Sequence, residues 1–173
     1  GYLTQIFSHW DGYTRPVEIV GATRNPILRK LVNAFGKFNV HYENLAFDQT
    51  ITNVKLIDIL NETEMKKMYL ESEIVGVSLP ESAIKQESIT IAKGLIERYK
   101  KNDSCLTILV VLNKINGGSY VEQNVKNALK NFVTEDKTEE IISKTFFAET
   151  VVNRMVSKIH RKTVLKQVEM ALR

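Results

Sequence analysis

Two apolar runs in the middle of the chain each end on polar residues that could contact a ligand. The run that begins at Glu73 ends on Ser78-Leu79-Pro80, and the run that begins at Cys105 ends on Asn113-Lys114. In parallel α/β sheets, ligands bind outside the carboxyl ends of the strands. We therefore expect a binding site where these two runs end, although Ser78 could equally be a simple strand-end residue and Asn113 a turn residue.

Metal and disulfide chemistry have little support in the sequence. His9, His41 and His160 are scattered, with no cysteine or carboxylate at ligand spacing, so we expect no metal site. Cys105 is the only cysteine, which rules out an intramolecular disulfide. Its position at the start of an apolar run predicts a small core residue, and a cytoplasmic setting is consistent with this cysteine usage.

The composition is that of an ordinary folded domain. The chain has 173 residues, of which 43% are hydrophobic and 25% charged, and this suits one α/β domain. The net charge of +4 is spread along the chain, and its densest cluster is best explained as the solvated face of a helix, so we expect no nucleic-acid partner. The absence of a run of 18 apolar residues predicts no membrane span. That basic cluster comprises Lys158, Arg161, Lys162 and Lys166.

A strand, helix and strand between residues 73 and 113 must position the two candidate ends. Residues 81–102 have helical spacing, and the runs that flank them are short enough to be strands. Such a βαβ unit makes its two strands parallel and neighbouring. Both strands are apolar on both faces, so we expect them in the middle of a sheet that helices cover on both sides. The alternation of strands and helices along the chain predicts an α/β fold with a mainly parallel sheet.

Other elements are predicted on either side of this unit. Asn25-Pro26 is typical of a helix start, with asparagine as the N-cap, and Gly36 is typical of a helix end. The expected buried stripe of this helix is Ile27, Leu28, Leu31, Val32 and Phe35. Before residue 73 we also expect a helix over 2–10, strands over 16–21 and 38–42, one or two strands within 43–60 with a turn at Thr52-Asn53, and a helix over 62–70. After residue 113 we expect a helix capped by Ser119, a helix over 134–143, a strand over 144–148, a loop or helical turn over 149–155, and a last amphipathic helix with Val164, Leu165, Val168 and Leu172.

Four segments, in this order and spacing, resemble the amino-terminal domain of the mannitol dehydrogenase family of long-chain polyol dehydrogenases. Residues 25–42 resemble the family's second-strand loop, helix and third strand, and residues 74–80 resemble its fourth strand. Ile91-Ala92-Lys93-Gly94-Leu95 resembles its "IAKGL" helix, and the strand after it ends on Asn113 like the family's "EN" pair. Phe146 to Met155 resembles its "F-V-D-S-x-V-D-R-I" segment. The likeness covers residues 1–156 and leaves residues 157–173 as a carboxyl-terminal helix of unclear role.

The resemblance implies a Rossmann-like, doubly wound, mainly parallel sheet without its first strand. It implies that Gly1 is the tail of a glycine-rich loop whose earlier glycines are absent, and such a loop binds pyrophosphate through backbone N–H groups. The lysine that acts as general base in the family is expected outside this chain. The parent enzyme would transfer hydride between a nicotinamide cofactor and a sugar alcohol or its phosphate.

The resemblance also implies which residues face the cofactor. At the strand end that should meet the adenosine ribose, the family's aspartate aligns with Thr23, next to Arg24 and Asn25. Because an NADP enzyme favours an arginine and no acid here, NADP is favoured slightly over NAD, and a solvated loop without cofactor binding is the third possibility. Val77 and Ser78 would lie under the adenine and ribose, and Asn113 near the nicotinamide ribose.

The resemblance places Glu149, Asn153 and Arg154 toward the substrate. The family often has Asn or Asp at the Glu149 position and Asp at the Asn153 position, and Arg154 could instead form a structural ion pair. Leu112 stands where the family has an acid. These changes favour an alternative in which the chain is a non-catalytic binding or interaction module that keeps the fold. A different nucleotide-binding α/β protein is a third reading.

Overall fold

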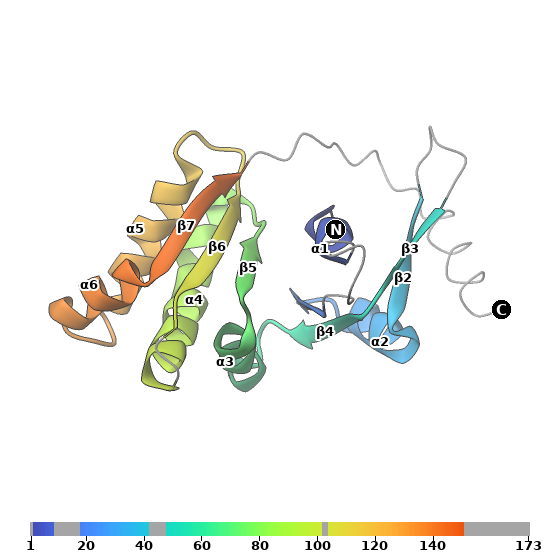
Figure 1. The fold of residues 1–173 in the computed structure, drawn as a ribbon, viewed down its shortest axis with the longest axis horizontal. Coiled ribbons are helices and arrows are strands. Elements are labelled where there is room, and N and C mark those ends of the chain that lie inside the picture. The colour runs from blue at the N-terminus through green and yellow to red at the C-terminus, as the bar shows by residue number, and fades with distance from the viewer. Residues whose placement is uncertain (1, 9–17, 42–47, 102–103, 151–173) are drawn as a thin grey trace.

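A computed structural model describes residues 2–8, 18–41, 48–101 and 104–150 of the chain. The elements alternate between strands and helices along most of this length (Figure 1). In chain order they are α1 (Tyr2–Ser8), β1 (Ile19–Thr23), α2 (Pro26–Phe35), β2 (Lys37–His41), β3 (Asp48–Thr52), β4 (Val54–Asp58), α3 (Glu62–Glu71), β5 (Ile74–Val77), α4 (Glu81–Lys101), β6 (Leu106–Val111), α5 (Gly117–Leu129), α6 (Glu135–Ser143) and β7 (Thr145–Thr150).

Five of these strands form two parallel groups. Strands β5, β6 and β7 form one parallel sheet in that order, and β1 pairs in parallel with β4. A doubly wound dinucleotide-binding sheet has the order 3-2-1-4-5-6. The groups β4-β1 and β5-β6-β7 match positions 3-2 and 4-5-6, and no strand among the described residues fills the position between β1 and β5. The chain therefore has a partial Rossmann fold, as the sequence predicted.

Strands β2 and β3 depart from the parallel pattern. They pair antiparallel, from Lys37 opposite Thr52 to His41 opposite Asp48, and form a separate two-stranded ribbon (Figure 1). The chain then turns at Asn53, whose φ of 58° is left-handed, and enters β4. Asparagine tolerates this conformation better than most residues. The prediction of one or two strands with a turn at Thr52-Asn53 is thus confirmed, and the structure has two strands there.

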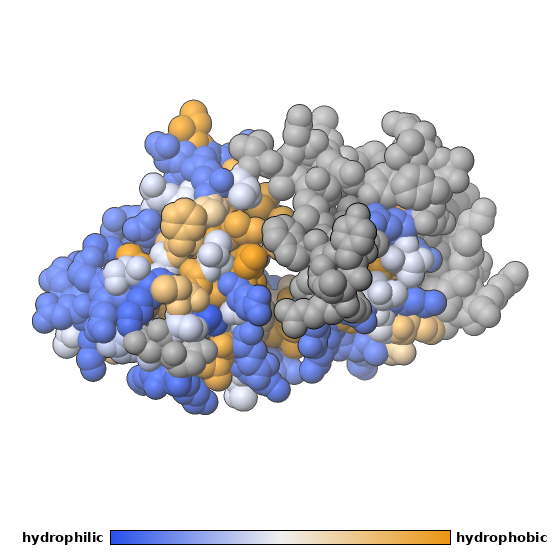
Figure 2. Space-filling model, viewed as in Figure 1, coloured by the Kyte–Doolittle hydropathy of each residue, from blue (hydrophilic) through white to orange (hydrophobic). Residues whose placement is uncertain are grey.

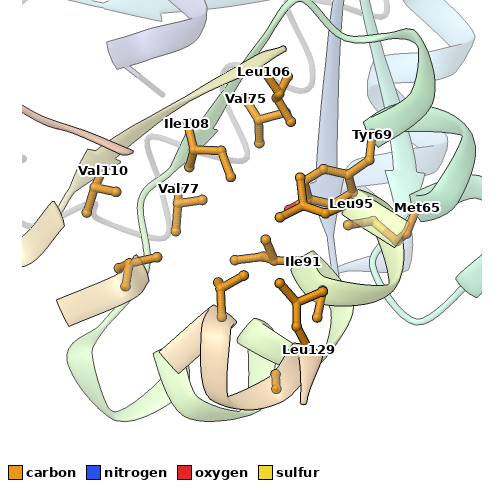
Figure 3. Close-up of a cluster of buried hydrophobic side chains, with 14 of the residues drawn as sticks. Met65, Tyr69, Val75, Val77, Ile91, Leu95, Leu106, Ile108, Val110 and Leu129 are labelled. Atoms are coloured by element: carbon orange, nitrogen blue, oxygen red, sulfur yellow. The ribbon is translucent and has the colours of Figure 1, made fainter. Parts of the chain in front are cut away.

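The predicted βαβ unit is present, but helices cover one face of its sheet more fully than the other. Val75, Val77, Ile108 and Val110 are buried against α4 and α5 (Figure 3). On the opposite face Ile74 is 41% exposed and Phe146 is 68% exposed. Figure 2, drawn from the same side as Figure 1, shows apolar side chains gathered over these strands.

The expectation of full cover on both faces is therefore wrong for the described residues. The reason is that the helices that follow β5 and β6 both pack on the same face. On the other face α1 covers β5 locally. The Leu3 side chain of α1 lies so close to Gly76 that a Cβ added at this glycine would be 2.7 Å from Leu3 Cδ1.

Two buried contacts fasten α4 to its neighbours. A Cβ added at Gly94 would lie 2.3 Å from Tyr69 Cδ2, so the absence of a side chain there lets α3 and α4 approach closely. Arg98 is buried, and its guanidinium donates hydrogen bonds to five backbone carbonyl oxygens at the end of α3 and the start of β6. Those carbonyls belong to Tyr69, Leu70, Ser72, Ser104 and Cys105.

The predicted ends of α2 are confirmed, but its predicted buried stripe is wrong. Asn25 caps the helix, Pro26 is its first residue, and Gly36 ends it with a left-handed φ of 62°. Only Val32 of the predicted stripe is buried, whereas Ile27, Leu28 and Phe35 are exposed and Leu31 is half-buried. Val32 joins a small second core with Ile51 and Val54, and this narrow core is too small to cover the whole apolar face.

Several local expectations need correction. Cys105 is exposed just before β6 and is not a core residue. Helix α5 begins at Gly117 after Asn116, so Ser119 lies inside the helix and does not cap it. Glu149 belongs to β7 and not to a following loop. The predicted helix over 2–10 is present as Tyr2–Ser8, and the expected last helix lies outside the described residues.

Candidate functional site

The candidate site lies at the carboxyl ends of the parallel strands. Within one group Thr23 at the end of β1 is paired with Asp58 at the end of β4. Within the other, β5 ends at Val77, and Val111 of β6 is paired with Thr150 of β7. These ends are where an α/β sheet of this class binds its ligand.

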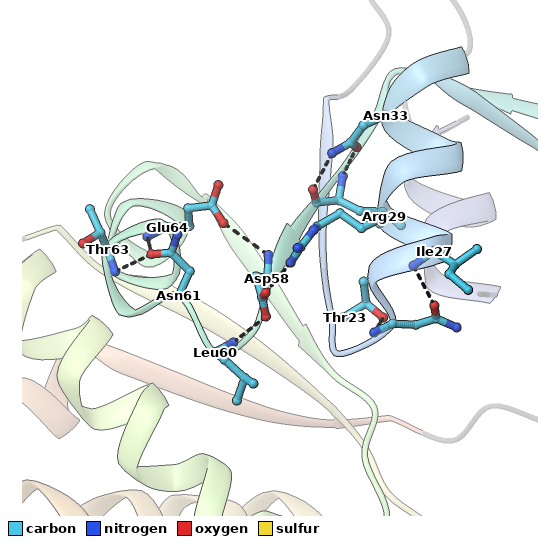
Figure 4. Close-up of polar contacts among 11 residues, drawn as sticks. Thr23, Ile27, Arg29, Asn33, Asp58, Leu60, Asn61, Thr63 and Glu64 are labelled. Carbon is cyan, nitrogen blue, oxygen red and sulfur yellow. Dashed lines mark hydrogen bonds and ion pairs between the residues drawn. The ribbon is translucent and has the colours of Figure 1, made fainter.

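Thr23 and Asn25 are both engaged in forming the turn from β1 into α2 (Figure 4). The Asn25 side-chain oxygen accepts hydrogen bonds from the backbone N–H groups of Ile27 and Leu28, each at 3.0 Å. The Thr23 hydroxyl oxygen accepts a hydrogen bond from Asn25 N at 3.1 Å. The side chain of Asn25 is therefore a helix cap in this structure, as the sequence also allowed.

Arg24 is held by a residue that the sequence analysis did not single out. Its Nη2 lies 2.7 Å from Oε1 of Glu87 on α4, and the two residues are 63 positions apart. The Glu87 side chain is 10% exposed, whereas that of Arg24 is 64% exposed. The spacing of α4 could have found Glu87, because it falls three residues after Ile84 and four before Ile91, on the buried stripe. The spacing could not show that Glu87 pairs with Arg24.

Asp58 serves the local structure at the end of β4 (Figure 4). It forms an ion pair with Arg29 of α2, and its carboxylate accepts a hydrogen bond from Leu60 N at 3.0 Å. The hydrogen bond from Arg29, followed by that from Leu60, lowers the pKa of the Asp58 carboxyl. This acid thus fastens α2 to β4 at the sheet end.

The remaining cofactor-side predictions lie on the neighbouring strands β5 and β6. The Val77 side chain is buried in the core, so only its backbone could reach a ligand. Ser78 and Asn113 are exposed, in the segments that follow the two strands. Next to Asn113, Lys114 Nζ lies 2.8 Å from Glu81 Oε1 at the start of α4, which fixes the loop after β6 to that helix.

Glu149 is placed beside the first turn of α5. Its Oε2 accepts a hydrogen bond from the Gly118 N–H at 3.3 Å, and a carboxylate is favoured at a helix amino end. A Cβ added at Gly118 would lie 3.3 Å from the Phe147 carbonyl oxygen, so this glycine allows α5 to approach β7. Gly1, Asn153 and Arg154 lie outside the described residues.

Other features of the described residues do not extend this site. No group of three or more His, Cys, Asp or Glu residues in the described ranges is arranged to hold a metal ion. None of the helices described is both long and apolar enough to cross a membrane. A shallow hollow at Glu18, Gly36 and residues 53–55 lies at the amino ends of β1 and β4, opposite the candidate end.

Comparison with known proteins establishes the fold. No family model matches the chain. The structure is similar to that of mannitol 2-dehydrogenase from Pseudomonas fluorescens, solved as a ternary complex with NAD and D-mannitol, with a TM-score of 0.71. The identity is 12%, and the match covers 88% of this chain and 38% of the other. At this identity the similarity shows a Rossmann-type fold, and the chain spans well under half the length of that enzyme.

Proposed function

We propose that this chain is the cofactor-binding domain of a nicotinamide-dependent polyol oxidoreductase of the mannitol dehydrogenase family. The observation that carries the proposal is the structural match to a polyol dehydrogenase solved with NAD and mannitol. The order and spacing of the segments that resemble the family add independent support. In this proposal residues 1–156 form the domain, and residues 157–173 are a separate terminal helix.

The residues at the sheet end fit a nicotinamide dinucleotide in their chemistry. Arg24, Ser78 and Asn113 are exposed at the ends of three parallel strands and offer guanidinium, hydroxyl and amide groups. All three groups can form hydrogen bonds with the neutral hydroxyl groups of a ribose. Arg24, Thr23 and Asn25 would lie at the adenosine ribose, Val77 and Ser78 at the adenine side, and Asn113 at the nicotinamide ribose, with Gly1 near the pyrophosphate.

When bound, the cofactor would supply hydride transfer, and the role of these residues is to bind and orient it. We place Glu149, Asn153 and Arg154 on the substrate side, facing a sugar alcohol or its phosphate. As the finer form of the proposal, we propose a polyol phosphate substrate, as for mannitol-1-phosphate 5-dehydrogenase, which the same sequence segments resemble. The general-base lysine is expected elsewhere in the parent enzyme.

A fluorescence titration of the parent protein that includes this chain with NADH and NADPH tests the proposal. We expect saturable binding, and we expect Asn113→Ala to weaken the binding of NADH by about tenfold, the loss of about one hydrogen bond. Asn127→Ala, on the exposed surface of α5, is the matched control and should leave the affinity unchanged. If neither dinucleotide binds the folded parent protein, the proposal is wrong and the alternative of a non-catalytic module gains support.

A further inference from the structure

Glu87 is a buried acid for which the proposed function has no role so far. Among the described residues the buried charged side chains are those of Glu87 and Arg98, and Arg98 is satisfied by five carbonyl oxygens. The partner of Glu87 is Arg24, at 2.7 Å. A buried carboxylate is costly unless it is paired, so this contact decides how Arg24 can be used.

We propose that Glu87, through Arg24, makes the site select NAD over NADP. This inference rests on the proposed function, because it concerns the same cofactor. It identifies Glu87 on α4 as a positioning residue that controls cofactor specificity from outside the segment that follows β1. It also reverses the preference for NADP that Arg24 suggested in the sequence alone.

The position of Arg24 supports this role. Arg24 directly follows Thr23, the last residue of β1, and the corresponding point of a Rossmann fold meets the 2′ position of the adenosine ribose. An arginine at that point favours a 2′-phosphate only when its charge is available to the phosphate. Here the guanidinium charge is already balanced by a carboxylate at hydrogen-bond distance.

The charge of Glu87 disfavours a 2′-phosphate in two ways. A phosphate that bound Arg24 would bring its own negative charge close to the buried carboxylate, and like charges repel. A phosphate that drew Arg24 away would leave Glu87 buried without its partner. The negative charge of Glu87 also acts on its surroundings, since it is the second cause, after burial, of the raised pKa of Tyr69.

A ribose 2′-hydroxyl meets neither obstacle. It is neutral, and it can accept a hydrogen bond from the guanidinium while Nη2 remains bonded to Glu87, because arginine carries five N–H donors. The Arg24 side chain is 64% exposed, so a large part of its surface faces outward. The ion pair therefore holds a donor in place for the hydroxyl of NAD.

Titrations with NADH and NADPH on wild type, Glu87→Gln and Glu139→Gln test the inference. Wild type should bind NADH more tightly than NADPH. Glu87→Gln should shift the ratio of the two dissociation constants toward NADPH by about tenfold or more, which corresponds to about 1.4 kcal/mol. Glu139→Gln removes an acid from another ion pair between two elements, with Lys126, and should leave the ratio unchanged.

Arg24→Gln is a second variant on the exposed partner, so the test does not depend on the folding of Glu87→Gln. It should lower the affinity for NADPH no further than the affinity for NADH, because in wild type the guanidinium is not available to the phosphate. A wild-type preference for NADPH, or an unchanged ratio in a folded Glu87→Gln variant, would overturn the role of Glu87 while leaving the proposed function standing. Failure of wild type to bind either dinucleotide would overturn both.

Discussion

The side chain of Asn33 forms two hydrogen bonds with the backbone of Leu56, as a neighbouring strand would (Figure 4). Its Nδ2 donates to the Leu56 carbonyl oxygen at 2.8 Å, and Leu56 N donates to its Oδ1 at 2.7 Å. An unpaired strand edge exposes such groups and invites association. Asn33 thus satisfies part of β4 and attaches α2 to it.

Asn33→Ala should lower the free energy of unfolding by about 1–2 kcal/mol, because it removes both hydrogen bonds. Urea unfolding followed by circular dichroism would measure the change. Asn39→Ala is the comparison, since the Asn39 side-chain oxygen accepts an exposed hydrogen bond from the Thr50 hydroxyl. An effect of Asn33→Ala no larger than that of Asn39→Ala would argue against the role of Asn33.

Gly94→Ala should destabilise the protein although alanine favours helices. The added methyl group would lie within 2.8 Å of three Tyr69 atoms, so α3 or the Tyr69 ring must move. Overpacking of this kind costs about 1–3 kcal/mol, which exceeds or offsets the helix-propensity gain of about 1 kcal/mol. Thermal unfolding compared with Gln86→Ala, on the exposed side of the same helix, would detect it. A rise in melting temperature for Gly94→Ala would contradict the close approach.

Arg98→Met should lower the free energy of unfolding by about 3 kcal/mol or more. The substitution leaves five carbonyl oxygens near the end of α3 and the start of β6 without their donor. Arg98→Lys should recover little of the lost free energy of unfolding, because one ammonium group cannot reach all of these oxygens. Arg29→Lys, on the half-buried side chain that pairs with Asp58, is the control and should cost less. Denaturant unfolding of the three variants would rank them, and equal losses would refute this account.

Lowering the pH should reduce the contribution of Glu62 to the free energy of unfolding. Hydrogen bonds from Lys66 and then from Lys93 lower the pKa of the Glu62 carboxyl from 4.5 to about 2. A carboxyl whose pKa falls on folding stabilises the folded state above its unfolded pKa, and that stabilisation disappears as the pH falls through the folded pKa. The stability difference between wild type and Glu62→Gln should therefore be constant above pH 4.5 and shrink between pH 4.5 and about 2.

Unfolding curves for wild type and Glu62→Gln at several pH values would test this. The difference should be small and should also decrease with added salt, because the pair is exposed to solvent. A difference that grew as the pH fell would have the wrong sign and would contradict the assignment.

Local signals in the sequence predicted most of the elements. The Asn25-Pro26 start and the Gly36 end of α2, the turn at Asn53, and the strand–helix–strand unit around α4 follow from short-range chemistry that the folded chain retains. The fold class follows from the alternation of those elements. These features were predictable because each depends on residues close together in the sequence.

What covers an apolar face was not predictable in this way. Periodicity identified the stripe of α2 and the two apolar faces of β5 and β6, but it could not show that Ile27 of α2 and Ile74 of β5 would remain exposed. The same limit applies to the site. Arg24 was recognised as a candidate from its position, but its pairing with Glu87 joins residues 63 positions apart and became visible only in the structure.

The main core has a consequence for the order of folding. Every buried residue of that core except Ile57 comes from the continuous stretch between Met65 and Ile141. This part of the chain can assemble without first closing a loop to the residues before it, which lowers the entropic barrier to its formation. We expect the backbone amides of β6, at the centre of its three-stranded sheet, to exchange with solvent more slowly than those of β1 and β4.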